Sequence, residues 1–342
     1  MSVMKLSLGI VGLPNVGKST LFNILTKQNV LAANYPFATI DPNVGVVPVP
    51  DERVDKLARL SSSKKVIPAV VEFYDIAGLV KGASQGEGLG NQFLTHIRDT
   101  QAVVMVLRTF KDDNVVHVES SIDPIRDLEI LNAELALKDL DTIVKRFAKL
   151  EGEARSGDKT ALANLELLKR VQEEVSVGSL IHKYAEEPII KEMQLLTAKK
   201  QIYLLNGSAE DASEELKKKI KDMGADYVIL NLADAQRSDI LENAGMLDLI
   251  KKSYEILGLI SFLTTGEDET RAWTIKRGEK APEAAGAIHT DFEKKFIRAE
   301  VINWQKLMEA GGWTEAKQKG WLRLEGKEYV VQDGDVLVIR HG

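Results

Sequence analysis

A glycine-rich stretch near the amino terminus contains the residues best suited to bind a phosphate. It runs Gly12-Leu13-Pro14-Asn15-Val16-Gly17-Lys18-Ser19 and matches the pattern G-x-x-x-x-G-K-[ST]. Glycines let such a loop curl so that its backbone N–H groups point at phosphate oxygens. Lys18 can reach the terminal phosphates of a nucleoside triphosphate, and the Ser19 hydroxyl can bind Mg²⁺. The pattern therefore indicates a site for a nucleoside triphosphate.

A second set of residues has the spacing of groups that sense the last phosphate. Asp75-Ile76-Ala77-Gly78 ends a strand pattern. Asp75 can hold the hydration shell of Mg²⁺, and the Gly78 N–H can reach the γ-phosphate. Thr39 lies between the first helix and the second strand, where a hydroxyl can bind Mg²⁺ only while the γ-phosphate is present. Together with the glycine loop, these residues indicate the switch segments of a nucleotide hydrolase.

Five short apolar runs must position these groups. They cover residues 6–11, 69–75, 102–107, 201–206 and 227–230. Helical patterns separate several of them, beginning with 19–25 directly after the glycine loop. Strands that alternate with helices indicate an α/β protein with a doubly wound sheet. A small-molecule kinase of this class would also carry a second substrate site and an arginine lid, and we identify neither in the sequence.

The chain from about Asp123 to Lys200 has a helical character, with few glycines and many charges. Two stripes of apolar residues are interrupted near 156–158, which predicts an antiparallel helical hairpin. The stripes consist of Leu137, Leu140, Val144 and Phe147, and of Leu162, Leu165, Leu168, Val171 and Val175. We interpret them as the packing seam of two helices. The basic residues beside them form a solvated face or, alternatively, a partner contact.

From about Gly258 onward, the sequence predicts a small α+β module. Residues 271–275 have a strand pattern, and 281–286 can begin a short helix. Residues 329–339 are typical of two strands joined by an Asp-Gly turn.

Composition favours a soluble protein. The 342 residues carry 45 basic and 51 acidic side chains, a formal charge of −6, and no cysteine. Disulfides and Cys-ligated metal sites are therefore excluded. The acidic balance argues against a protein that coats nucleic acid over most of its surface. No apolar run approaches the ~20 residues of a membrane span and no signal peptide is apparent, so we expect a cytoplasmic protein without a membrane contact.

The motifs and their flanks resemble the YchF/Obg-like ATPases, a branch of the Obg-related P-loop proteins. The resembling segments are GLPNVGKSTLFN, AANYPFATIDPNVGVVPVPD, EFYDIAGLVKGASQGEGLGNQFL, DPIRDLEILNAELALKDLD, TTGEDETRAWTIKRGEKAPEAAGAIHTDFEKKFIRAEVI and LEGKEYVVQDGDV. The resemblance implies an interrupted nucleotide-binding domain (1–127 and 200–257), a helical coiled-coil insertion (128–199) and a TGS domain with a β-grasp fold (258–342). It also implies ATP hydrolysis with Mg²⁺, bound by Ser19, Thr39 and Asp75, and association with ribosomal RNA and proteins. We expect a monomer.

The sequence lacks the N-K-x-D motif, whose aspartate reads guanine in GTPases. After the fourth strand it has Asn206-Gly207-Ser208-Ala209-Glu210, where the family usually has N-x-x-E. Ala209 at the fourth place opposes guanine reading and favours adenine bound by Asn206 and backbone groups near Gly207. The residues expected to bind the nucleotide are therefore Asn15, Val16, Gly17, Lys18, Ser19, Thr20, Asn206 and Gly207.

Leu79 follows the switch glycine, near the place where regulatory GTPases have a glutamine that orients the attacking water. A leucine cannot hydrogen-bond water. The resemblance instead assigns the orienting of the water to His117. The expected catalytic residues are therefore His117, Lys18 and Gly78. The alternative is that His117 only packs or faces solvent. The family also links an asparagine at the position of Asn15 to a K⁺ ion beside the phosphates, the alternative being a loop asparagine suited to a tight turn.

These observations indicate an Mg²⁺-dependent ATPase that acts as a molecular switch on the ribosome. Two alternatives stay open. One is an Obg-type GTPase, which the missing guanine motif opposes. The other is a nucleotide-gated binding adaptor whose hydrolysis is incidental, and Leu79 is compatible with it.

Overall fold

The computed structural model describes residues 7–27, 43–76, 97–111, 121–237 and 243–342. It divides into two compact units. Within the described ranges, the first comprises Met1–Val46 and Glu72–Leu249, and the second comprises Val47–Val71 and Ile250–Gly342. The second unit thus includes residues 47–71, which the family resemblance assigns to the nucleotide-binding domain. No helix in these ranges is both long enough and apolar enough to cross a membrane.

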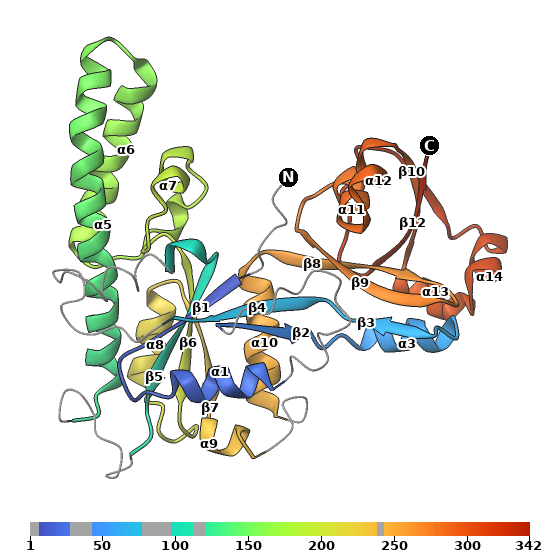
Figure 1. Ribbon diagram of the computed structural model, residues 1–342, viewed down its shortest axis with the longest axis horizontal. Helices are drawn as coiled ribbons and strands as arrows, with labels where there is room; N and C mark the ends of the chain where they lie inside the picture. The colour runs from blue at the N-terminus through green and yellow to red at the C-terminus, as the bar shows by residue number, and fades with distance from the viewer. Residues whose placement is uncertain (1–6, 28–42, 77–96, 112–120, 238–242) are drawn as a thin grey trace. The chain divides into compact units, whose positions relative to one another are not determined.

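A six-stranded sheet forms the centre of the first unit, with the strand order β2-β4-β1-β5-β6-β7 (Figure 1). Its strands are β1 (Ser7–Val11), β2 (Val44–Pro48), β4 (Val70–Asp75), β5 (Ala102–Arg108), β6 (Lys200–Asn206) and β7 (Asp226–Leu230). β1 pairs in parallel with β4 and β5, and the parallel pairing continues to β6 and β7. The five strands predicted from apolar runs are confirmed, whereas β2 was not predicted.

Helices follow these strands, and some of them pack on the sheet. They are α1 (Lys18–Thr26), α5 (Pro124–Arg155), α6 (Lys159–Ser176), α7 (Pro188–Met193), α8 (Glu214–Asp222), α9 (Leu232–Ala235) and α10 (Ala244–Ile256), with a 3-10 turn at His182–Tyr184. α1 contacts β1 and α9, α5 contacts β5, and α8 contacts β7. Every residue of β1 and β5 is buried, which explains their nearly continuous apolar sequences. Because β1 ends just before the glycine loop, this loop lies at the carboxyl edge of the parallel sheet.

The helices α5 and α6 form an antiparallel hairpin, as the interrupted stripes predicted (Figure 1). Asp123 and Asp158 cap their amino termini with side-chain hydrogen bonds. Gly157, at a φ of 89°, lies in the connection. A residue with a side chain would be strained at this φ, so glycine allows the short turn.

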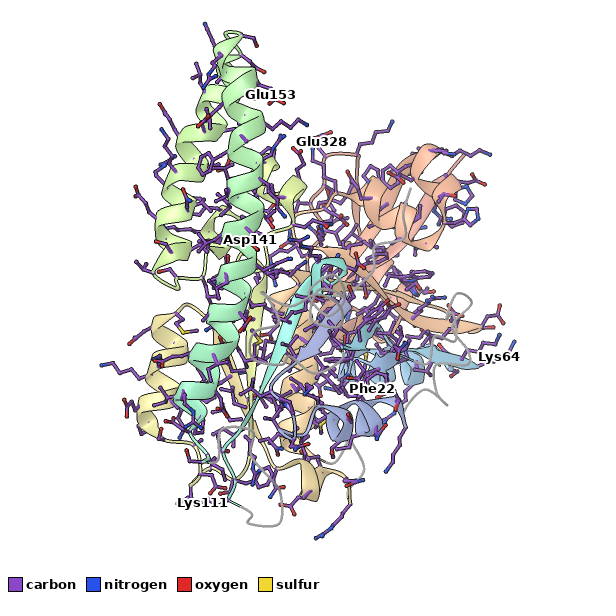
Figure 2. All side chains as sticks on the ribbon, turned by 60° about the vertical axis from the view of Figure 1, so that its left-hand side comes forward. Phe22, Lys64, Lys111, Asp141, Glu153 and Glu328 are labelled. Carbon is purple, nitrogen blue, oxygen red and sulfur yellow. The ribbon has the colours of Figure 1, made fainter. Side chains whose placement is uncertain are left out.

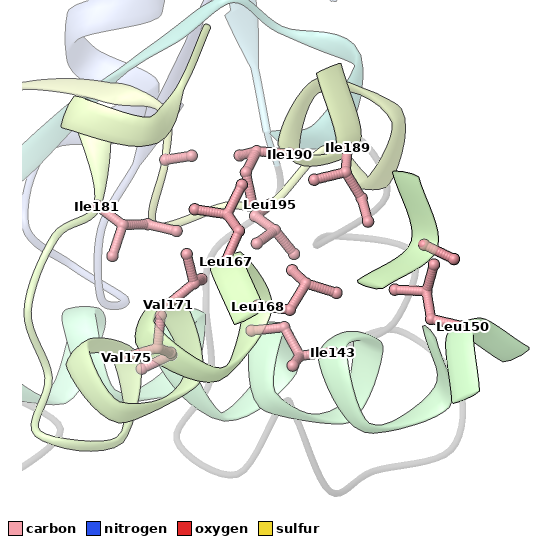
Figure 3. Close-up of a cluster of buried hydrophobic side chains, with 13 residues drawn as sticks. Ile143, Leu150, Leu167, Leu168, Val171, Val175, Ile181, Ile189, Ile190 and Leu195 are labelled. Carbon is pink, nitrogen blue, oxygen red and sulfur yellow. The ribbon is translucent and has the colours of Figure 1, made fainter. Parts of the chain in front are cut away.

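The seam of the hairpin differs from the predicted one. Figure 3 shows the buried cluster, which consists of Ala136, Ile143, Leu150, Ala161, Leu167, Leu168, Val171, Val175, Ile181, Ile189, Ile190, Leu195 and Ala198. Leu137, Val144 and Leu162 are exposed instead, so the prediction was wrong for these three. On α5 the buried face passes through Ile143 and Leu150, one helical position away from the predicted stripe.

The second unit contains another six-stranded sheet, with the order β11-β10-β12-β8-β9-β3. Its elements are α3 (Glu52–Leu60), β3 (Lys65–Ile67), β8 (Leu259–Thr265), β9 (Glu269–Lys276), α11 (Ala281–Ile288), α12 (Thr290–Lys294), β10 (Phe296–Asn303), α13 (Trp304–Ala310), α14 (Trp313–Gln318), β11 (Arg323–Glu325) and β12 (Asp335–His341). α11 packs on β9 and β10. The predicted α+β composition is confirmed. The predicted hairpin at 329–339 is wrong, because β12 pairs with β10 and β8, and Val330 makes only an isolated bridge to Lys280.

Residues 47–71 complete this second sheet and its packing. β3 pairs in parallel with β9, which is the next strand in the sheet although it lies far along the chain. Arg53 on α3 makes ion pairs with Asp51 over 2.7 Å and with Asp333 over 2.8 Å. The Ser63 hydroxyl donates a hydrogen bond to the Gly266 carbonyl oxygen over 2.6 Å. The segment is therefore an integral part of the second unit.

Candidate nucleotide-binding site

The glycine loop has a backbone conformation that requires glycine at one position. Gly17 adopts a φ of 108°, in the left-handed region. A Cβ atom at Gly17 would lie 2.6 Å from Asn206 Nδ2 and 2.8 Å from Leu232 Cδ1. Both the conformation and the lack of space exclude a side chain here. The loop is thus held in one shape between β1, Asn206 and Leu232.

Helix α1 begins at Lys18 with its amino end open. Its N-cap residue is Gly17, which makes no side-chain capping bond. The first-turn N–H groups of a helix have no partner within the helix and carry a partial positive charge. The hydroxyl group of Ser19 is exposed in this turn, and Thr20 follows it. The arrangement suits a phosphate that accepts from backbone N–H groups beside a hydroxyl.

Lys18 is a buried charged side chain at the end of the loop. It is only 8% exposed, and its Nζ donates a hydrogen bond to the Leu13 carbonyl oxygen over 2.7 Å. Burial lowers the pKa of Lys18 to about 8, and the nearby Asp75 partly opposes this shift. Burial likewise raises the pKa of Asp75, against the effect of Lys18. The two charges lie on neighbouring parts of the sheet edge, because Asp75 is in register with Ile10.

A cavity of about 690 Å³ opens beside the loop. It is lined by Asn15, Gly17, Lys18, Ser19, Thr20, Phe110, Lys111, Asn206, Asn231, Leu232, Ala233 and Gln236. Among these described residues the only charged side chains are the two lysines, and none is a carboxylate. Its volume falls in the usual range of small-molecule sites, and its charge suits an anion with an attached uncharged group.

Asn206 joins three segments around the cavity. Its Nδ2 donates a hydrogen bond to the Val16 carbonyl oxygen over 2.9 Å, and its Oδ1 accepts one from the Leu232 N–H over 3.1 Å. Its own carbonyl oxygen accepts hydrogen bonds from the N–H groups of Thr109 and Phe110. Asn206 thus connects the end of β6 to the glycine loop, to the end of β5 and to the start of α9.

In the turn after Asn206, the acidic side chain of Asp211 forms hydrogen bonds within the turn itself. Asp211 Oδ2 accepts hydrogen bonds from the Ser208 N–H over 2.9 Å and from the Ser208 hydroxyl over 2.8 Å. These bonds lower the pKa of Asp211. Ala209, at the place of the guanine-reading aspartate, is exposed and does not line the cavity. Gly207 is buried behind the cavity, where a Cβ atom would lie 2.3 Å from Thr109 Oγ1.

The structure therefore brings together Asn15, Gly17, Lys18, Ser19, Thr20 and Asn206 at one cavity. Two further residues stabilise the walls of the cavity without lining it. The Val16 carbonyl oxygen accepts a hydrogen bond from Asn206, and Gly207 packs closely against Thr109. Asp75 acts on Lys18 through its charge. Thr39, Gly78, Leu79 and His117 lie outside the described residues.

Phe110 and Lys111 line the cavity but were not recognised in the sequence. They directly follow β5, and Lys111 projects at the end of this strand (Figure 2). In open parallel sheets, ligands bind beyond the carboxyl ends of the strands. Their position after the predicted strand at 102–107 was the signal that could have found them.

A buried strand, a loop with a left-handed glycine, a helix starting at a buried lysine and an aspartate at the end of the adjacent parallel strand define a P-loop nucleotide-binding fold. A family model described as a 50S ribosome-binding GTPase matches residues 7–145. A second model, for the carboxyl-terminal part of YchF GTPases and described as a protein of unknown function, matches residues 259–342.

Relatives match nearly the whole chain. The ribosome-binding ATPase YchF of Bacillus subtilis is 46% identical, covering 98% of this chain and 99% of its own length. The protein of the same name from Escherichia coli O157:H7 is 43% identical, covering 96% of this chain and 97% of its own. The solved structure of the Schizosaccharomyces pombe YchF GTPase is 37% identical, with a TM-score of 0.84 and 99% of both chains covered. The chain belongs to the YchF family, which confirms the resemblance found in its motifs.

Proposed function

We propose that this protein is an Mg²⁺-dependent ATPase that binds the ribosome in the cytoplasm. One observation carries the proposal, namely the cavity that joins the phosphate loop to the ends of β5 and β6 without a described carboxylate in its lining. Guanine is selected by a carboxylate that accepts two of its hydrogen bonds. Without such a group the cavity favours a base that does not require one, and adenine is such a base.

Each residue of the site has a role in this proposal. Lys18 and the N–H groups of residues 15–20 bind the phosphates, and Gly78 contacts the γ-phosphate. Ser19, Thr39 and Asp75 offer hydroxyl and carboxylate oxygens, the donors that Mg²⁺ prefers, and they would hold that ion. The ion would neutralise charge on the phosphates. His117 orients the attacking water.

The base occupies the far end of the cavity from Lys18. Phe110 and Asn206 line the cavity, and we assign the aromatic contact of the base to Phe110 and its polar contacts to Asn206 and the backbone near Gly207. Asn206 accepts the Leu232 N–H with its Oδ1 and donates one Nδ2 hydrogen to the Val16 carbonyl oxygen, so its contribution to the base comes from the second Nδ2 hydrogen. Asn15 is the residue we assign to a K⁺ ion beside the phosphates.

Ribosome binding rests on the relatives from Bacillus subtilis and Escherichia coli, which are called ribosome-binding ATPases. We propose that the helical insertion (128–199) and the carboxyl-terminal domain (258–342) present the contact surface, and that the protein acts as a monomer. The Schizosaccharomyces pombe relative is named a GTPase, so GTP stays the competing nucleotide. A protein that binds GTP more tightly than ATP would be an Obg-type GTPase instead.

Competition between nucleotides tests the proposal. ATP, ADP, GTP and GDP should each displace a fluorescent ribose-labelled ATP in the presence of Mg²⁺, with ATP tighter than GTP. Phosphate release should require ATP and Mg²⁺ and be lost in Lys18→Met. The K⁺ site predicts faster release in K⁺ than in Na⁺ buffer. Identical rates in the two buffers would contradict a role for K⁺ at Asn15.

Cosedimentation with ribosomes separates the switch from its alternative. A switch driven by hydrolysis should stay bound with a non-hydrolysable ATP analogue and leave after ATP is cleaved. An adaptor that only needs nucleotide binding should leave equally well with the analogue and with ATP. His117→Ala should slow release in the first case and leave it unchanged in the second.

A further inference from the structure

Arg108, the last residue of β5, is a buried cation that the roles above do not use. Its side chain has no exposed surface, and it is among the largest fully buried side chains in the described ranges. Its guanidinium carbon lies 4.5 Å from the centre of the Phe110 ring. Its Nε donates a hydrogen bond to the Phe110 carbonyl oxygen over 3.3 Å. Burying a guanidinium is costly, so a site that keeps one there needs strong compensating contacts.

Phe110 is held from both sides of its backbone. Its N–H donates to the Asn206 carbonyl oxygen over 3.2 Å, and its carbonyl oxygen accepts from Arg108. β5 and β6 bring these two partners together, because Arg108 is in register with Asn206. The side chain of Phe110 reaches the cavity, whereas Arg108 does not line it. Among the residues that line the cavity, Phe110 is therefore the one through which we trace the effect of Arg108 on a bound molecule.

We propose that Arg108 is a positioning residue that holds the Phe110 ring as a stacking surface for the base of the nucleotide. This inference rests on the proposed nucleotide-binding function. The guanidinium lies within the distance of a cation–π contact and covers one face of the ring. The remaining face and edge are the parts that can meet a flat aromatic ring in the cavity. Bases stack on aromatic side chains whatever their hydrogen-bonding pattern. A fixed Phe110 ring should therefore strengthen the binding of any nucleobase, and that of the larger purines most.

A double-mutant cycle tests the role. The variants are Arg108→Met, Phe110→Leu and the double variant, with Arg108→Lys as the conservative replacement. ATP affinity is measured by calorimetry with Mg²⁺, inorganic tripolyphosphate by competition with labelled ATP, and folding by thermal unfolding. We expect Arg108→Met to weaken ATP binding by about 3- to 30-fold. Arg108→Lys should restore part of that loss, and Arg108→Met should add nothing in the Phe110→Leu background.

A merely structural role gives a different pattern. Arg108→Met would then weaken ATP and tripolyphosphate equally, or would lower ATP affinity by the same factor with and without Phe110. Either result, or ATP binding unchanged in Arg108→Met, overturns the inference. If Arg108→Met does not fold, Arg108→Lys in both backgrounds provides the same comparison. A wild-type protein that binds neither ATP nor GTP overturns the proposed function itself, which is a separate result.

Discussion

The side-chain amide of Asn206 donates a hydrogen bond to the carbonyl oxygen of Val16 over 2.9 Å, across 190 positions of the sequence. The same side chain accepts the Leu232 N–H over 3.1 Å. Val16 and Leu232 are both buried, so neither backbone group can turn to water if the amide is removed. One side chain at the end of β6 thus fixes the glycine loop that begins after β1.

Replacement of Asn206 by alanine should destabilise the protein and weaken nucleotide binding together. It leaves a buried carbonyl oxygen and a buried N–H without partners, each of which costs about 1–3 kcal/mol. We expect the free energy of unfolding to fall by about 2–6 kcal/mol in urea titrations. Nucleotide affinity, measured by calorimetry, should fall in the same variant because the loop loses its support.

Asn231→Ala is the matched control for this prediction. Asn231 also lines the cavity, but its side chain only caps α9, accepting from the N–H groups of Ala233 and Asp234. Both of these residues are exposed, so the loss should be about 1 kcal/mol. Equal losses for the two variants would show that the bridge to Val16 adds nothing.

Lys18→Met should abolish tight nucleotide binding without unfolding the protein. Burial lowers the pKa of this lysine to about 8, so removing its charge relieves a cost of the unliganded state. The lost hydrogen bond to Leu13 costs only about 1 kcal/mol. Affinity for ATP with Mg²⁺ should drop by about 10- to 150-fold, as expected for a charge-assisted bond.

Lys111→Met provides the comparison for this lysine. Lys111 lines the same cavity, yet it is exposed and lies after β5 (Figure 2). An exposed charge contributes little, so we expect about a 2- to 5-fold loss of affinity. If Lys111→Met binds ATP as weakly as Lys18→Met, the phosphates do not lie at the glycine loop.

The strands and the glycine loop were predictable from the sequence because their signals are local. Runs such as 102–107 are apolar since both faces of a parallel strand are covered. The seam of the hairpin was harder, because apolar residues recur at three- and four-residue spacing on two adjacent faces of α5. Leu137 and Val144 satisfy that spacing and are exposed, whereas Ile143 and Leu150 are buried. Only the position of α6 decides between the faces.

Features that depend on distant pairing had no local signal. The Asp333-Gly334 turn is real, but the residues before it do not pair with β12, which has β10 and β8 as neighbours. β3 has only three residues, and its partner β9 lies far along the chain. Likewise, the hydrogen bond from the Phe110 N–H to the Asn206 carbonyl oxygen depends on the pairing of β5 with β6.

Arg53→Met should destabilise the second unit, because Arg53 neutralises two carboxylates there. Its side chain is 18% exposed, and that of Asp51 is 8% exposed. Asp333 also accepts the Ser261 N–H over 3.0 Å, so the network links α3 to β8. Leaving Asp51 without its partner should lower the free energy of unfolding by about 2–3 kcal/mol, measured in urea.

Lys64→Ala controls for surface charge in the same unit. Its ion pair with Asp268 is 75% and 92% exposed, and the side chain of Lys64 projects into solvent (Figure 2). We expect a change of no more than about 0.5 kcal/mol. A larger loss from Lys64→Ala than from Arg53→Met would contradict the view that residues 47–71 are held mainly through the Arg53 network.

The base of the helical hairpin should respond to pH through Asp139. This buried carboxylate on α5 accepts hydrogen bonds from the Leu196 N–H over 2.9 Å, the Thr197 N–H over 2.7 Å and the Thr197 hydroxyl over 2.6 Å. Burial raises its pKa, although these bonds oppose the shift. Between the pKa of Asp139 in the unfolded state and its higher pKa in the folded state, the folded protein therefore keeps a proton that the unfolded chain has lost. The resulting stability is complete below about pH 4 and is lost as the pH rises through the folded pKa.

Asp139→Asn removes this titration, so the stability of wild type relative to the variant should decline from about pH 4 upward, by about 1.4 kcal/mol for each unit of pKa shift. Urea unfolding between pH 4 and pH 8 measures the difference. Burial lowers the pKa of nearby Lys199 to about 8, so that group changes stability only above this window. Asp141→Asn, on the exposed side of α5 (Figure 2), should give a curve parallel to wild type. If the stability of wild type relative to Asp139→Asn instead increases with pH, the three hydrogen bonds outweigh burial. The hairpin is then anchored by a charged carboxylate.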